Sequence, residues 1–138
     1  MKAVFAHTFY WIALINPDDT CYRYAVAFDK VLANVKVVMT DEVLTEFMTF
    51  FSGNPHQRVK VAATVRRLLI LPGVQVIPQS RESFLAGLDL YQSHPGKGYS
   101  LVDCISMQTM RREGLTEVLT NDRHFEQEGF RALFRDSA

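Results

Sequence analysis

Short runs rich in apolar residues alternate with longer amphipathic stretches along the chain. Four such runs have the length and composition of buried strands, and they span residues 3–6, 35–39, 74–77 and 117–120. The stretches between them predict six helices, at 8–15, 21–33, 41 onward, 55–71, 81–93 and 101–113. A short fifth strand is predicted at 131–134. We found no internal repeat, low-complexity tract or linker.

Residues that typically begin or end helices stand at these boundaries. N-caps or first helical residues are predicted at Thr40-Asp41, Asn54-Pro55 and Ser80. Asn34 and Gly114 are predicted to end the second and sixth helices. The stretch 94–98 is predicted as a loop because it is rich in helix breakers.

The alternation of strands and helices indicates the fold class. It favours an α/β fold with a short parallel sheet covered by helices on both faces. The 138 residues form one domain at typical domain size, so residues 1–138 are predicted as a single unit. Folds of this class place their active sites beyond the C-terminal ends of the strands.

Polar residues follow three of the predicted strands. His7 and Thr8 come after the first strand, Glu46 lies in the helix after the second, and Asn121-Asp122 follow the fourth. Asp103 lies in the first turn of the helix that follows the glycine-containing loop. If the sheet is parallel, these positions can meet at one edge.

Each acid also has a purely structural interpretation. Asp103 stands three residues after Ser100 and can complete a capping box. Asp122 can cap the short turn that follows it, and Glu46 can belong to an exposed stripe with Glu42. Together, however, clustered carboxylates repel one another unless a positive charge lies among them. Mg²⁺ or Mn²⁺ suits such oxygen ligands and can promote attack of water on a phosphodiester.

Four segments carry a resemblance to a known family. Residues 4–14, 40–47, 99–106 and 119–125 resemble, in order, the motifs of PIN-domain ribonucleases, specifically the VapC-like toxins of bacterial type II toxin–antitoxin modules. The resemblance implies a three-layer α/β/α sandwich and a Mg²⁺- or Mn²⁺-dependent endoribonuclease. It assigns the metal-binding acids to Glu46, Asp103 and Asp122. It also implies a homodimer that a cognate antitoxin silences by binding near the acids.

One position departs from the family pattern, because His7 stands where the family has its first Asp. An imidazole ligates only when it is neutral, and it suits Mn²⁺ or Zn²⁺ better than Mg²⁺. Our hypothesis is that His7 is protonated beside the carboxylates and partly replaces the cation, which weakens the enzyme. The alternative is a histidine hydrogen-bonded to backbone at the helix start.

The departure at His7 keeps a second function open, that of a catalytically silent PIN-like module that binds antitoxin or RNA without cleavage. A phosphoacceptor receiver domain also has alternating strands and helices. It requires an acidic pair after the first strand and an Asp after the third, and the chain has His7-Thr8 and Pro78-Gln79 there. That class is excluded.

Composition adds little about partners. Lys plus Arg and Asp plus Glu both number 15, so binding to RNA depends on a local basic patch. Candidate phosphate contacts are Arg66, Lys97, Arg112 and Arg123.

Supporting polar groups near the acids are Thr8, Ser100 and Asn121. The aromatic cluster is predicted as core and partner interface, and it consists of Tyr10, Trp11, Phe47, Phe50 and Phe51. Phe9 and Trp11 are predicted to line a groove for the antitoxin.

The cellular setting follows from what the sequence lacks. No apolar run reaches the roughly 20 residues of a membrane span, and polar His7 interrupts the segment where a secretion signal needs apolar residues. Cys21 and Cys104 are far apart and form no metal-binding motif. We therefore expect a cytoplasmic protein without a membrane segment.

Overall fold

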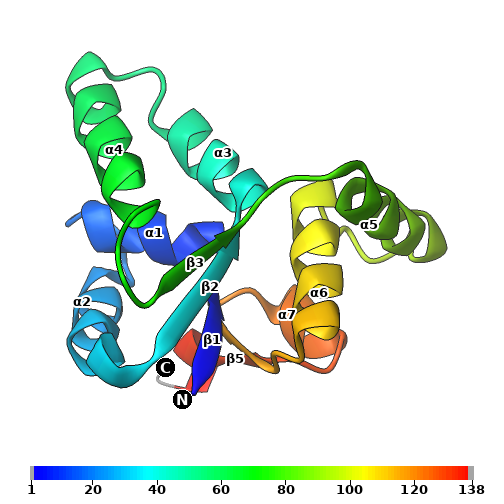
Figure 1. Ribbon diagram of the computed structural model, residues 1–138. Helices are drawn as coiled ribbons and strands as arrows, with labels where there is room; N and C mark the ends of the chain where they lie inside the picture. Colours follow the sequence, from blue (N-terminus) through cyan, green and yellow to red (C-terminus); the bar gives the residue numbers. More distant parts are fainter. Residues whose placement is uncertain (1, 137–138) are drawn as a thin grey trace.

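The computed structural model describes residues 2–136, and it has a parallel sheet at its centre (Figure 1). The strands are β1 (Ala3–Ala6), β2 (Lys36–Thr40), β3 (Val74–Ile77), β4 (Glu117–Leu119) and β5 (Arg131–Ala132). Their order is β3-β2-β1-β4-β5, and every pairing is parallel. In the register, Phe5 of β1 lies opposite Val38 of β2 and Val118 of β4. The predicted parallel sheet is confirmed.

Helices cover both faces of the sheet (Figure 1). One layer contains α1 (Thr8–Ile15), α2 (Tyr22–Val31), α3 (Asp41–Phe50) and α4 (Pro55–Leu68). The other contains α5 (Arg81–Ser93), α6 (Leu101–Glu113) and the short α7 (Arg123–Gln127). A 3₁₀ turn, η1 (Leu32–Asn34), follows α2, and α8 (Leu133–Asp136) ends the described chain. This is the three-layer α/β/α sandwich expected from the sequence.

The predicted helix starts are built as their residue types suggest. The side chains of Thr40, Asn54 and Ser80 accept hydrogen bonds from backbone N–H groups three residues on, at 3.2, 3.0 and 3.0 Å. Gly114 ends α6 with a φ of 70°, in the left-handed region that glycine adopts without a Cβ clash. These local signals were sufficient to place the helices.

Three boundaries differ clearly from the prediction, and one of them is the end of the fourth helix, at Leu68 instead of Leu71. The second helix stops at Val31, and Asn34 closes a 3₁₀ turn instead of a left-handed cap, since no non-glycine residue among those described has a positive φ. The segment 131–134 contributes only Arg131 and Ala132 to the sheet before the chain turns into α8. At this edge the strand has a partner on one side only, so few backbone bonds extend it.

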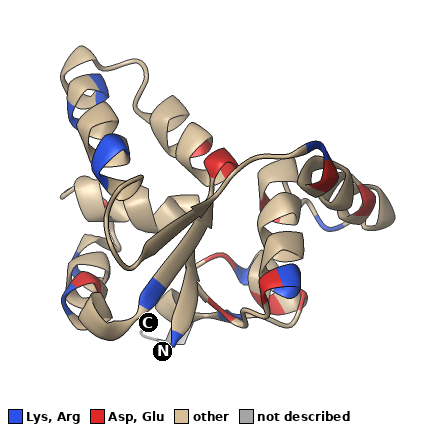
Figure 2. Ribbon diagram, viewed as in Figure 1, with Lys and Arg blue, Asp and Glu red and all other residues tan. Residues whose placement is uncertain are grey.

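The core lies between the sheet and its helices. Tyr10, Phe47 and Phe51 are buried in it, as predicted, whereas Phe50 is 61% exposed. Both cysteines are free thiols. Within residues 2–136 no helix is long and apolar enough to cross a membrane. In the view of Figure 2, α4 carries only basic and α3 only acidic charged residues, and both kinds occur on α2, α5 and α6, consistent with the balanced net charge.

Candidate active site

A cavity of about 580 Å³ opens where β1 and β4 end. The residues that line it come from α1, α3, α6, α7, α8 and the turn after β4. They are His7, Thr8, Phe9, Ile12, Glu46, Phe50, Asp103, Thr120, Asn121, Asp122, Arg123 and Arg135. All four predicted chemistry-bearing positions, His7, Glu46, Asp103 and Asp122, therefore face one cavity, as the parallel topology requires.

Asp103 has both of the roles considered for it. Its backbone N–H donates to Ser100 Oγ, and its Oδ2 accepts the backbone N–H of Ser100, both at 3.0 Å, which completes the capping box. The same carboxylate is only 8% exposed and borders the cavity. The cap thus fixes the direction in which the carboxylate points.

The buried His7 ring is bonded on both sides by side chains. Its Nε2 lies 3.0 Å from Asp103 Oδ1, and its Nδ1 lies 3.3 Å from Ser106 Oγ. The alternative of a histidine held by backbone is therefore wrong. An Asp–His–Ser chain is also the arrangement of a hydrolase triad, but Ser106 is fully buried and cannot reach a substrate.

These bonds set the charge of Asp103. Burial alone raises the pKa of a carboxyl group because it disfavours the charged form. Here the hydrogen bond and charge of His7, together with the two bonds to Ser100, outweigh burial and hold the pKa of Asp103 below its usual value. Asp103 is thus a carboxylate at neutral pH.

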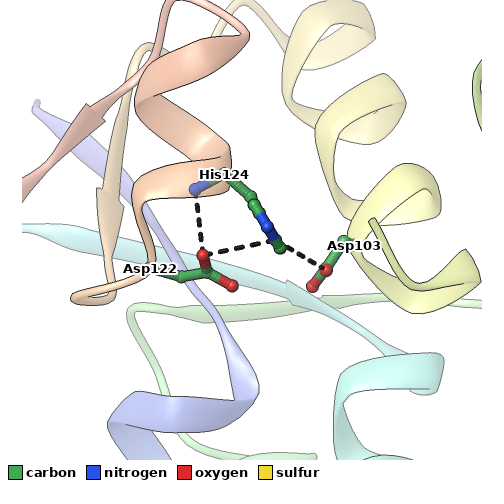
Figure 3. A group of neighbouring side chains, drawn as sticks. All are labelled: Asp103, Asp122 and His124. Carbon is green, nitrogen blue, oxygen red and sulfur yellow. Dashed lines mark hydrogen bonds and ion pairs between the residues drawn. The ribbon is translucent and has the colours of Figure 1, made fainter. Parts of the chain in front are cut away.

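Asp122 begins α7 and brings His124 beside Asp103. Its Oδ1 accepts the backbone N–H of His124 at 2.9 Å, so the predicted cap is present. The His124 ring extends between the two carboxylates, with Nδ1 at 3.4 Å from Asp122 Oδ1 and 3.9 Å from Asp103 Oδ2 (Figure 3). Nδ1 is inaccessible to solvent and makes no hydrogen bond to any described residue.

These three residues form the tightest group of potential ligands in the described chain. One ligand atom each from Asp103, Asp122 and His124 lie within 4.8 Å of one another. Glu46 and His7 border the same cavity but are outside that group. His124 was not among the site residues predicted from the sequence; its position two residues after an Asp at a helix start was the available signal.

The three residues predicted to support the acids have different surroundings. Thr8 is 5% exposed, and its Oγ1 has no hydrogen-bond partner among the residues described. Asn121 lines the cavity, with its Nδ2 3.8 Å from Cys21 Sγ, whereas Ser100 acts through the cap of α6. Trp11 is buried and does not line this cavity, although Phe9 does.

Two arginines border the cavity. Arg123 was predicted as a phosphate contact, and Arg135 of α8 was not, because its neighbours along the chain carry no nuclease motif. The other predicted contacts, Arg66, Lys97 and Arg112, do not line the cavity.

A network behind α7 holds the His124 ring. The Tyr99 ring meets it edge-on at 5.1 Å, and the Tyr99 hydroxyl donates to Glu128 Oε2 at 2.9 Å. Arg111 donates to Glu128 Oε1, also at 2.9 Å. Burial and the bond to Glu128 raise the pKa of Tyr99 to about 12, so its hydroxyl remains a donor. Although burial opposes ionisation of Glu128, its bonds to Arg111 and Tyr99 lower the pKa of that group.

The donor set fits a divalent cation. Two carboxylates and the Thr8 hydroxyl, which has no partner among the described residues, line the cavity, and the solvent-inaccessible Nδ1 of His124 lies beside the two carboxylates. Oxygen and imidazole ligands are those that Mg²⁺, Mn²⁺ and Zn²⁺ use in proteins.

Comparison with known proteins identifies the fold and the family. The sequence matches the PIN domain over residues 7–130, so the chain belongs to the PIN-domain family. The structure is similar to Mycobacterium tuberculosis VapC20, a sarcin–ricin loop cleaving toxin, with a TM-score of 0.82 and 24% identity over 92% of this chain and 95% of that one.

A second solved structure has the same fold at lower similarity. FitAcB from Neisseria gonorrhoeae matches with a TM-score of 0.65 and 18% identity, over 94% of this chain and 95% of that one. No curated protein sequence matches the chain. The resemblance to PIN domains noted from the sequence is confirmed, and both solved structures share the fold of this chain.

Proposed function

We propose that the chain is a metal-dependent endoribonuclease, the toxin of a toxin–antitoxin pair, whose activity is weakened by His7. The observation that carries this proposal is the convergence of Asp103 and Asp122 in the cavity of a PIN domain, although they lie in different helices. Mg²⁺ or Mn²⁺ is the proposed cofactor, and RNA is the proposed substrate.

Each residue of the cavity has a proposed role. Asp103, Asp122 and Glu46 would hold the cation, which when bound supplies a Lewis acid and a water of lowered pKa. Thr8 and Asn121 are placed to orient a water or a phosphate oxygen, while Ser100 fixes Asp103. Arg123 and Arg135 supply positive charge at the mouth for the RNA backbone.

His7 is the reason for proposing weakened activity. Its Nε2 occupies one oxygen of Asp103, and an imidazole there replaces a carboxylate of the family pattern. We propose that a protonated His7 takes part of the counter-charge that a cation otherwise provides. The hydrogen bond between His7 and Asp103 also favours the second candidate function, a silent module that binds antitoxin or RNA without cleavage.

RNA cleavage by the wild-type chain and its His7→Asp variant discriminates between these functions. The substrates are structured RNAs that include a sarcin–ricin-loop hairpin, each tested with Mg²⁺, Mn²⁺ or chelator. We expect slow, chelator-sensitive cleavage by the wild type and faster cleavage by His7→Asp, with Asp103→Asn inactive in both backgrounds. Cleavage gained only in His7→Asp supports the silent module, and equal cleavage in chelator contradicts metal dependence.

The proposed partners follow from exposed apolar surface. Phe9, Ile12 and the exposed Phe50 form an apolar wall of the cavity that suits a segment of a cognate antitoxin. The outer face of α5 exposes Phe84, Leu85, Leu88 and Tyr91, each 37–50% accessible, and suits a homodimer contact. A cytoplasmic location is proposed with the toxin function, since a cytoplasmic toxin meets RNA directly.

A further inference from the structure

The His124 ring nitrogen that lies between Asp103 and Asp122 lacks a satisfactory partner. Nδ1 is inaccessible to solvent and lies near two carboxylate oxygens, at 3.4 and 3.9 Å, without forming a hydrogen bond. Buried polar atoms normally pair, because leaving one unpaired costs free energy. The arrangement of His124 between Asp103 and Asp122 therefore suits a cation that contacts all three side chains (Figure 3).

Thr8 provides independent evidence for a cation beside Asp103 and Asp122. It belongs to α1, an element far from α7 along the chain, and its side chain is almost completely buried. Its Oγ1 also has no partner among the described residues, and Thr8 lines the same cavity as Asp103 and Asp122. Thus one unsatisfied polar atom lies in the cavity that Asp103 and Asp122 line, and another, from a separate element, lies between these two acids.

We infer that His124 is a direct nitrogen ligand of the cation, which makes this a mixed nitrogen–oxygen site selective for a transition metal such as Zn²⁺ or Mn²⁺ over Mg²⁺. The inference rests on the metal site of the proposed function and specifies its chemistry. Asp103 and Asp122 would supply the oxygen ligands, and the unpartnered Thr8 hydroxyl belongs to a residue that lines the same cavity. Neighbouring ligands about 2.1 Å from one ion are roughly 3.0–3.4 Å apart, close to the separation of His124 Nδ1 and Asp122 Oδ1.

The same nitrogen cannot come from His7 as the residues are arranged. Both ring nitrogens of His7 are engaged, one by Asp103 and the other by Ser106. His124 instead has Nδ1 toward the acids, with its ring held by Tyr99. Because imidazole binds Zn²⁺ and Mn²⁺ better than Mg²⁺, the selectivity is predicted to depend on His124.

Calorimetric titration of the metal-free full-length chain tests the selectivity. Zn²⁺ and Mg²⁺ are titrated separately into the wild type, His124→Asn and His56→Asn, where His56 is an exposed histidine on α4. We expect His124→Asn to lose about 10–100-fold in Zn²⁺ affinity and much less in Mg²⁺ affinity, and His56→Asn to match the wild type. Equal losses for the two metals would overturn the inference.

Electron spin echo envelope modulation of the Mn²⁺-loaded protein tests the ligand directly. We expect ¹⁴N modulation from a directly bound imidazole in the wild type and in His7→Asn, and its loss in His124→Asn. Persistence of the modulation in His124→Asn, or its absence in the wild type, overturns the inference. Should His124→Asn fail to fold, uniform ¹⁵N-histidine labelling of the wild type and of His7→Asn gives the same comparison.

The failure of this inference is distinguishable from failure of the proposed function. Mn²⁺ binding with chelator-sensitive RNA cleavage but no nitrogen modulation leaves the nuclease intact and removes His124 as a ligand. Absence of saturable binding by any of the three cations removes both.

Discussion

His7 Nε2 and Asp103 Oδ1 lie 3.0 Å apart, although 96 residues separate them in the chain. The contact joins the end of β1 to the first turn of α6, so it connects the sheet to the helix that carries the most buried acid of the site. In a PIN domain with an acid at both positions, the two carboxylates would repel and require a cation. In this chain the imidazole satisfies Asp103 within the protein.

The first prediction concerns the stability of His7→Asp. Without metal we expect the variant to be destabilised by about 1–3 kcal/mol, because a buried hydrogen bond is lost and two carboxylates become neighbours. Added Mn²⁺ should then raise the melting temperature of His7→Asp more than that of the wild type. Thermal unfolding followed by circular dichroism, with Mn²⁺ or chelator, measures both effects. His56→Asp is the control, and an equal Mn²⁺ shift in all three proteins contradicts the prediction.

The parts of the fold that could be predicted from the sequence are those set by local signals and by the order of the elements. Thr40, Asn54, Ser80 and Gly114 act within one helical turn of themselves, so sequence alone placed the starts of α3, α4 and α5 and the end of α6. The topology of a parallel sheet then placed the acids at one edge, because it needs only the order of strands and helices.

The sequence could not predict the contacts between side chains of different helices and strands. The position of His124 depends on how α7 packs against α6 and on the Tyr99 ring, and Ser106 reaches His7 only through the fold. Likewise, Arg135 borders the cavity because α8 folds back beneath β4. No spacing along the chain encodes these distances.

The second prediction concerns the pH dependence of Glu128. Its pKa in the folded state is lowered, so its contribution to stability is present above the unfolded value of about 4.3 and is lost as pH falls through the folded value. We expect Glu128→Gln to be less stable than the wild type by about 1–3 kcal/mol at pH 7, because the charge-assisted bond to Arg111 is weakened. The difference should shrink as pH falls below 4. Urea unfolding at several pH values measures it, and a constant difference contradicts the assignment.

The third prediction concerns the close packing of α5 on α6. A Cβ at Gly87 would overlap Ile105 Cγ1 and lie 3.0 Å from the Ile105 backbone nitrogen. We expect Gly87→Ala to destabilise the protein by about 1–3 kcal/mol despite the better helix propensity of alanine, because two backbones must separate. Gly53→Ala is the matched control, since no atom lies within 4 Å of its added Cβ. Chemical unfolding of both variants decides, and equal stability would show that α5 moves freely.

The fourth prediction concerns the proposed dimer. Leu88 is 38% exposed on the outer face of α5, near Phe84 and Tyr91 along the helix. A charge buried there without a partner is costly, so we expect Leu88→Glu to convert a dimer into a monomer. Val59→Glu, at a 74% exposed position on α4, should leave the assembly unchanged. Light scattering after size exclusion measures the mass, and a wild-type monomer or a Leu88→Glu dimer contradicts this use of α5.

The fifth prediction concerns the arginines and RNA. Arg135 lines the cavity, whereas Arg66 lies exposed on α4 outside it, so the two separate a local contact from a general effect of charge. In an Asp103→Asn background, which prevents cleavage, we expect Arg135→Gln to weaken RNA binding and to reduce the slope of log affinity against log salt by about 1. Arg66→Gln should change neither quantity. Fluorescence anisotropy with a labelled RNA at several salt concentrations measures the slope. If the two variants behave alike, RNA reaches the protein by a surface other than this cavity, and Arg135 serves its contacts within the protein, an ion pair with Glu126 and a hydrogen bond to the Asn121 carbonyl.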